Sequence, residues 1–288
     1  MPNAIDSQTL RDIISENRRL VRVVCVGEAG AAAATEMIMD GVNTDIFVYF
    51  RSGPKNRSVT HELVCETLIG AHTVILVAAI SDCDVDILNL IGRSAQSIEI
   101  LTIGIFTTDN RSGTDHNLIS HLSENFDTVF LKSIDTLAAS NEASVEFLNQ
   151  ACAGLAEICY GRYIVKATVK DLDELFSKKG KGFIAFGRAA GAERGPKALN
   201  KALAHPGLNG LDLSRAKGAL FIFKINTSVT DTSSRMKEIR ALMKVVFDLD
   251  PANGSGLFSD DVVLWFTAVD SDTFSDECSV TIVVTGSL

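Results

Sequence analysis

Residues 20–41, LVRVVCVGEAGAAAATEMIMDG, decide how the fold begins. Residues 20–26 form a valine-rich run, which is typical of a parallel strand buried on both faces. Gly27 and Gly30 are expected to make a turn, and the alanines from Ala31 onward are expected to open a helix. This connection predicts a potential anion site, because the unpaired N–H groups of the first helical turn and the helix dipole face the same point.

The same turn also argues against a phosphate ligand. Glu28 would repel an anion, and Ala29 and Ala31 narrow the space in which the backbone must approach a phosphate closely. Connections of this kind are common without any ligand, so the turn alone leaves both interpretations open.

Composition sets limits on the class of protein. The chain has 288 residues, of which 46% are hydrophobic and 22% charged, and its mean hydropathy is +0.19. These values predict a globular chain with a large core. A net charge of −9 makes nucleic acid an unexpected partner. With no signal peptide, no C-x-x-C pair and no histidine spacing suited to a metal, the six cysteines are expected to be reduced thiols in a cytoplasmic protein.

Strand and helix patterns alternate through the first half of the chain. This alternation predicts a parallel sheet covered on both faces, with any ligand at the carboxyl ends of the strands. The predicted strands are residues 20–26, 45–50, 73–80, 98–106 and 128–131.

Residues 142–160 form the longest predicted helix, which is apolar over much of its girth and is expected to lie between layers. The patterns after it predict a smaller α+β domain. The chain is therefore predicted to have an α/β fold with an N-terminal extension, a parallel sheet domain, a central helix and a C-terminal α+β domain. The corresponding ranges are 1–19, 20–141, 142–163 and 164–288.

The order of these elements and several motifs resemble the tubulin/FtsZ family, nearest to bacterial FtsZ. Residues 182–223, GFIAFGRAAGAERGPKALNKALAHPGLNGLDLSRAKGALFIF, are similar to its strand, G-x-A-x-G-E-x-R turn, helix and small-residue strand. TAVDSD at 267–272 and CSVTIVVTG at 278–286 resemble its final hairpin, and VRVVCVGEAGAAAATEMI at 21–38 resembles its first strand and loop. The resemblance covers residues 20–286. It implies a GTP pocket at the strand ends and head-to-tail filaments in which one subunit completes the active site of the next.

The phosphate-binding motifs of the family are degenerate in this chain. The glycine-rich first loop is replaced by GEAGAAAA at residues 27–34, and the G-G-G-T-G-T-G signature by ISDCDVD at residues 80–86. The resemblance places the nucleotide contacts of this degenerate, Rossmann-like domain at Gly27, Glu28, Ala29, Gly30, Ala31, Ser81, Asp82 and Cys83. The carboxylates of Asp82, Asp84 and Asp86 would repel a polyphosphate unless a metal or protonation intervened.

The catalytic and guanine-reading positions are also altered. The family's catalytic loop, N-x-D-x-x-D, is KATVKD at residues 166–171. Asp171 is its only remnant, and Thr168, which stands in place of the first acid, cannot polarise water as a carboxylate does. The guanine-reading residue falls near Val145 and Glu146, and Glu146 is either that reader or a solvated acid of the first helical turn.

Together these losses predict a divergent FtsZ-like bacterial cell-division protein, a pseudo-GTPase that has lost GTP hydrolysis and GTP binding and uses no cofactor. Its expected partner is itself, as a filament or dimer, or a related FtsZ. Lys166, Thr168, Lys170 and Asp171, with Arg188 and Glu193 on the same end, would meet the acidic pocket of the next subunit through charge pairing. FtsZ has a membrane-tethering peptide beyond the last motif, and this chain ends at Leu288, so direct membrane binding is not expected.

Other interpretations remain open from the sequence. One is an active GTPase that holds GTP or GDP with Mg²⁺ in an unusual pocket. Another is a pocket repurposed for a different ligand, such as Mg²⁺ or Ca²⁺ at Asp82, Asp84 and Asp86, although such a run is also an ordinary helix start. A dinucleotide-dependent oxidoreductase is disfavoured, because the second strand ends in Phe50 and Arg51 and not in an acid. The last open interpretation is a dimeric structural protein that never polymerises.

Overall fold

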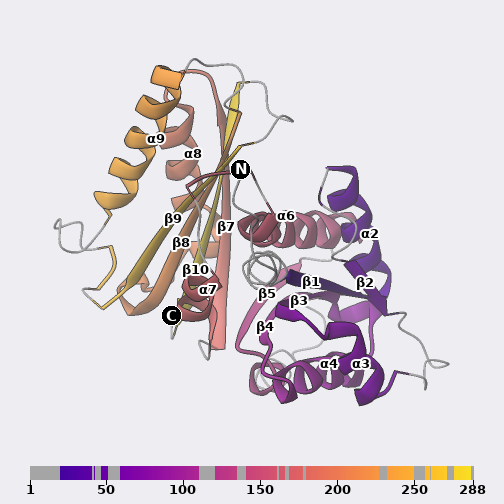
Figure 1. The fold of residues 1–288 in the computed structure, drawn as a ribbon. Helices are drawn as coiled ribbons and strands as arrows, with labels where there is room; N and C mark the ends of the chain where they lie inside the picture. The colour runs from indigo at the N-terminus through magenta and orange to yellow at the C-terminus, as the bar shows by residue number, and fades with distance from the viewer. Residues whose placement is uncertain are drawn as a thin grey trace, which may run out of the picture.

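A computed structural model describes residues 20–40, 42, 47–50, 59–109, 121–134, 141–160, 162–165, 169–177, 180–226, 232–249, 257–259, 261–270 and 276–286. Within these ranges the strands form one sheet, in the order β2-β1-β3-β4-β5-β7-β10-β8-β9-β6 (Figure 1). The predicted N-terminal extension and the basic segment at residues 51–58 lie outside the described residues.

The N-terminal half of the sheet is parallel throughout. Its strands are β1 (Leu20–Val26), β2 (Phe47–Phe50), β3 (Ala71–Ala79), β4 (Leu101–Asp109) and β5 (Thr128–Ile134). Helices α2 (Gly27–Met39) and α6 (Asn141–Tyr160) cover one face, and helices α3 (His61–Leu68) and α4 (Val85–Ser97) cover the other (Figure 1).

Strand β1 shows why its run of valines is continuous. Val21, Val23 and Cys25 pack into the core beneath α2 and α6. Val24 and Val26 face the opposite core, beneath α3 and α4. Because alternate side chains point to opposite faces and both faces are buried, every position except Arg22 is apolar.

The C-terminal half extends the same sheet with mixed pairing. Its strands are β6 (Arg162–Val165), β7 (Gly180–Ala190), β8 (Ala216–Ile225), β9 (Val263–Asp270) and β10 (Glu277–Gly286). Its helices are α7 (Val169–Phe176), α8 (Arg194–Leu203) and α9 (Thr232–Phe247), and Figure 1 shows α6 crossing between the two halves. The predicted fold class, with a parallel sheet, a long central helix and a C-terminal α+β part, is confirmed.

The pairing of the last two strands differs from the predicted hairpin. Strand β8 lies between β9 and β10, parallel to β9 and antiparallel to β10. All but two of the ten residues of β8 are buried, and such a strand is more stable in the interior of a sheet than at its edge. The short strand β6, which the sequence analysis missed, pairs with β9.

The two halves of the sheet are joined by a short parallel ladder between β5 and β7. Its register pairs are Thr128↔Gly180, Val129↔Lys181 and Phe130↔Gly182. A Cβ atom on Gly182 would lie 2.2 Å from Cε1 of the Phe130 ring, so glycine leaves the space that this ring fills. The ring also contacts Phe176 of α7 edge to face, with centroids 6.2 Å apart. Phe130 therefore packs the junction and α7 together.

We expect Phe130→Ala to lower the free energy of unfolding by about 3–5 kcal/mol, because it empties a fully buried ring site. Urea unfolding followed by circular dichroism measures this loss. Phe247→Ala on α9 is the matched control, because that ring is 65% exposed, and its change should stay within about 0.5 kcal/mol. Equal losses in the two variants would show that Phe130 does not hold the junction.

Candidate functional site

The connection between β1 and α2 is tighter than the predicted glycine turn. Helix α2 begins at Gly27, directly after Val26, and Gly27 has a φ of +77°. Gly30, predicted to lie in the turn, is inside the helix, where a Cβ atom would lie 2.7 Å from the carbonyl oxygen of Val77. Gly30 therefore permits close packing of α2 on β3, and no loop remains here to wrap a phosphate.

The N-terminus of α2 is occupied by a carboxylate from the chain itself. Asp82 lies in the short 3-10 helix η2 (Ile80–Asp82), which follows β3. Its Oδ2 accepts a hydrogen bond from the N–H of Ala29 at 2.7 Å. Its Oδ1 lies where a side chain on residue 27 would be, since a Cβ atom on Gly27 would be 2.3 Å away. Asp82 thus takes the position at which a helix N-terminus attracts an anionic ligand.

The environment of Asp82 disfavours its charge. Burial raises the pKa of this carboxyl, and the charge of Glu28 adds to that rise. The backbone N–H groups of Ala29 and Glu28 oppose it. Oδ1 is buried and has no hydrogen-bond partner among the described residues. The carboxylate therefore stays at the helix end at an energetic cost, and a second anion at this point would raise that cost further.

The other residues of the segment after β3 act in different ways. Asp84 caps helix α4, where its Oδ1 accepts the N–H of Asp86 at 3.0 Å, as in an ordinary helix start. Burial, with the charges of Asp82 and Asp84, raises the pKa of the Cys83 thiol to about 12. Ser81 and Asp86 are exposed. No group of three or more metal-ligating side chains is arranged for a cation within the described ranges.

The remaining predicted nucleotide contacts do not gather around Asp82 in the same way. Ala31 is half-buried in α2, and Glu28 is exposed. Glu146 is exposed on α6, and its Oε1 accepts a hydrogen bond from Nε2 of Gln150 at 3.1 Å. The groups brought together here are thus Gly27, Ala29 and Asp82, where Ala29 donates a hydrogen bond to Asp82 and Gly27 leaves room for its carboxylate.

The residues predicted for the subunit interface lie on and before α7. Lys166 and Thr168 are outside the described residues. Lys170 is exposed, whereas Asp171, the remnant of the catalytic loop, is only 8% exposed. Little of its carboxylate would be accessible to a neighbouring subunit.

Helix α7 and Asp82 lie at opposite ends of the parallel sheet. Oδ2 of Asp173 in α7 lies 3.4 Å from Nε2 of His72, which is at the start of β3. Asp82 follows the end of the same strand. The nine residues of β3 span about 30 Å at roughly 3.3 Å per residue. The predicted interface residues of α7 and the acidic segment after β3 are therefore about one strand length apart.

Two other predicted interface residues flank a buried ion-pair cluster. Arg188 pairs with Glu277 across β7 and β10, and Glu193 precedes α8 with a φ of +57°. Between α8 and α9, the buried guanidinium of Arg194 donates to both carboxylate oxygens of Glu238 at 2.7 and 2.9 Å. These bonds raise the pKa of Arg194. The sequence analysis noted the surrounding E-x-R turn but not this structural role.

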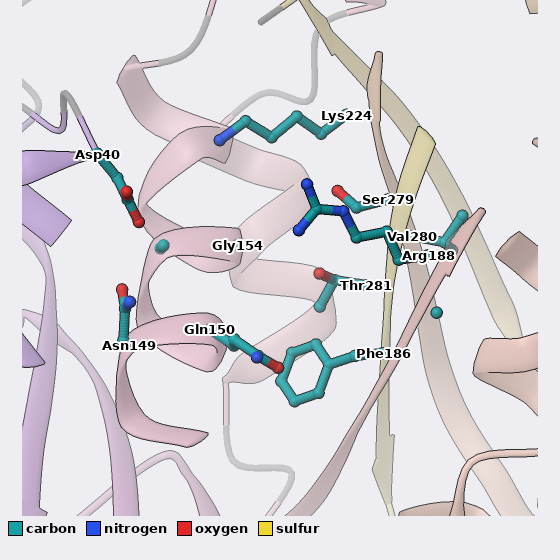
Figure 2. Close-up of a pocket in the computed structure, with 12 residues that line it drawn as sticks. Asp40, Asn149, Gln150, Gly154, Phe186, Arg188, Lys224, Ser279, Val280 and Thr281 are labelled. Carbon is teal, nitrogen blue, oxygen red and sulfur yellow. The ribbon is translucent and has the colours of Figure 1, made fainter. Parts of the chain in front are cut away.

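A groove of about 570 Å³ separates α6 from the C-terminal strands. Figure 2 shows Arg188 and Lys224 extending from the strands toward α6, with Asp40 on the opposite side and Phe186 near Gln150. No sequence motif marked this groove, because its lining comes from α6, β7, β8 and β10 and from Asp40, the residue after α2. No helix in the described part of the chain is long and apolar enough to cross a membrane.

Comparison with known proteins gives matches in both sequence and structure. No protein-family model matches the chain. Its sequence is 24% identical over 215 residues to the cell division protein FtsZ of Neisseria meningitidis serogroup A. The alignment covers 68% of this chain and 52% of that protein. The chain thus spans about half the length of the curated FtsZ relatives that it matches.

The structural matches extend over nearly the whole chain. An empty FtsZ dimer from M. jannaschii matches with a TM-score of 0.75 and 14% identity, over 98% of this chain and 93% of that one. A CetZ2 protofilament with bound GTPγS, from Haloferax volcanii, matches with a TM-score of 0.57 and 12% identity, over 93% of each chain. The chain therefore has the fold of these FtsZ and CetZ structures, and its sequence is distantly similar to that of FtsZ.

Proposed function

We propose that this chain is a cytoskeletal scaffold of the tubulin/FtsZ fold that associates with itself and has lost both GTP binding and GTP hydrolysis. The observation that carries the proposal is the Asp82 carboxylate on the N–H of Ala29. The structural relatives include a dimer and a protofilament, which supports self-association as the retained property.

Loss of nucleotide binding follows from competition for one site. A phosphate at the N-terminus of α2 would have to displace Asp82 and break its hydrogen bond of 2.7 Å. It would also approach the exposed carboxylates of Glu28, Asp84 and Asp86. At about 4 Å each such pair of charges costs roughly 1 kcal/mol in water and roughly 4 kcal/mol near a protein surface. The residues present do not fit GTP with its Mg²⁺.

Loss of hydrolysis is supported at the opposite end of the molecule. A carboxylate supplied to a neighbouring subunit must be exposed, and Asp171 is 8% exposed in the first turn of α7. Thr168 replaces the other acid that the resemblance implies, and threonine is a poor general base.

Self-association without nucleotide would rest on charge. The exposed Lys170 lies at one end of the sheet, and the acidic residues Glu28, Asp84 and Asp86 lie at the other. Two copies stacked head to tail would bring these opposite charges together, with Lys166 and Thr168 as further contacts. Charge pairing between copies would then replace the nucleotide as the link between subunits.

Nucleotide binding is the first test. Calorimetry on nucleotide-stripped protein with Mg²⁺ should show no saturable heat of GTP or GDP binding at ligand concentrations up to about 1 mM. A Kd of about 1 mM corresponds to a binding free energy of only about −4 kcal/mol. A micromolar Kd with turnover would overturn the proposal and establish the alternative, an active GTPase with an unusual pocket.

Asp82 gives a pH test with a defined sign. The pKa of Asp82 is raised in the folded chain above its ordinary value of 3.8. The folded state is therefore most stable with Asp82 protonated, and this stability is lost as the pH rises through the raised pKa. Asp82→Asn keeps an oxygen that accepts the Ala29 N–H and removes the charge. We therefore expect this variant to gain stability over the natural chain between about pH 4 and pH 7 in urea unfolding.

The control for this test is Asp86→Asn, which removes an exposed carboxylate from the same segment. The free energy of unfolding of this control should equal that of the natural chain at each pH. If the free energy of Asp82→Asn also equals that of the natural chain, Asp82 does not carry a disfavoured charge at the end of α2.

Assembly should depend on salt and on Lys170. Light scattering at about 50 mM salt should fall several-fold at about 500 mM, where the screening length shortens to about 4 Å. Lys170→Glu should lower the scattering at low salt, whereas Arg93→Glu, the same charge change on the exposed face of α4, should leave it near that of the natural chain. Scattering that is insensitive to salt and to Lys170→Glu would exclude charge pairing as the link.

A further inference from the structure

A cluster of chemically reactive side chains lies between α3 and α4. Cys65 follows His61 by one turn of α3, and its Sγ is 3.6 Å from Nε2 and 3.9 Å from Nδ1 of that imidazole. Nδ1 in turn lies 2.9 Å from Oγ of Ser94 on α4. Because Ser94 is fully buried, its hydroxyl fixes the position of the exposed imidazole beside the sulfur.

The sulfur of Cys65 contacts polar groups of α4 as well as His61. The carbonyl oxygen of Ser94 accepts a hydrogen bond from the thiol at 3.7 Å. The hydroxyl of Ser97 lies 4.0 Å from Sγ. An imidazole that takes the proton becomes a cation next to the sulfur, and a neighbouring cation favours the thiolate, which is the nucleophilic form.

The other four cysteines whose side chains the structure describes are in settings that suppress the thiolate. Cys25, Cys152 and Cys278 are buried, and burial raises the pKa of each thiol, to about 12 for Cys25 and Cys278 and well above the ordinary value for Cys152. Cys83 is half-buried, with a pKa raised to about 12 by burial and by two aspartates. Cys65 differs in combining solvent access with a contacting base.

We propose that Cys65 is a modification site, a thiol activated by His61 and oxidised to a sulfenic acid by small peroxides. The thiolate sulfur attacks one oxygen of hydrogen peroxide, so that an S–O bond forms and the O–O bond breaks. The sulfur loses two electrons to the peroxide, and the departing hydroxide takes the proton held by His61 and leaves as water. Ser94 positions the imidazole and does not touch the peroxide.

The test uses the full chain, hydrogen peroxide as the oxidant and dimedone to trap sulfenic acid, with each cysteine followed by peptide mass spectrometry. We expect Cys65 to be trapped at least about tenfold faster than Cys83 near pH 7. His61→Gln should slow the reaction at Cys65 by about tenfold or more, because the base that contacts the sulfur is removed. Ser94→Ala should give an intermediate loss, because the imidazole remains but its position is no longer fixed.

His72→Gln is the matched control, since the contacts of His72 are with Thr73 and Asp173. It should leave the rate at Cys65 unchanged. The charge of Glu62 interacts with that of His61, so Glu62→Gln separates its effect on the rate at Cys65 from that of the imidazole. The proposal is overturned if Cys65 reacts no faster in the natural chain than in urea-unfolded protein, or if His61→Gln, with an unchanged circular dichroism spectrum, reacts at the natural rate.

Discussion

The hydrogen bond from the Ala29 N–H to the Asp82 carboxylate places a charge of the chain itself at the strand-end edge of this molecule. In an open α/β sheet this edge, with a helix N-terminus behind it, is where an anionic ligand binds. Here the chain supplies the anion from η2. The raised pKa of Asp82 and the absence of a hydrogen-bond partner for its buried Oδ1 among the described residues indicate that holding this charge at the helix end costs free energy. The edge is thereby satisfied internally, and the surrounding carboxylates are left to face solvent or another chain.

Much of the fold follows from local pattern. Strands such as β1 and β3 are apolar on both faces because helices cover both faces of a parallel sheet, and their positions were predicted to within a few residues. The pairing of β9 and β10 was not predicted correctly. Two strands that are consecutive in sequence usually pair, and only the burial of β8 on both faces shows that it separates them.

The site was predicted less completely than the fold, for a physical reason. The sequence showed that acids replace glycines after β3, and it showed that a run of aspartates can start a helix, which Asp84 does. It did not show that Asp82 turns inward, because that depends on the distance between two segments 53 residues apart. The burial of Asp171 and the Cys65–His61–Ser94 cluster also depend on how separate elements pack.

The narrow ladder between β5 and β7 has a mechanical consequence. Among the residues that the structure describes, three register pairs connect the two halves of the sheet, and the Phe130 ring fills the space over Gly182 at one of them. In a stack of subunits that contact one another at opposite ends of the sheet, tension along the stack would enter one half and leave through the other. The load would then cross these three pairs and the core beneath α6, and the bending stiffness of such a polymer would be set there, inside each subunit, as much as at the contacts between subunits.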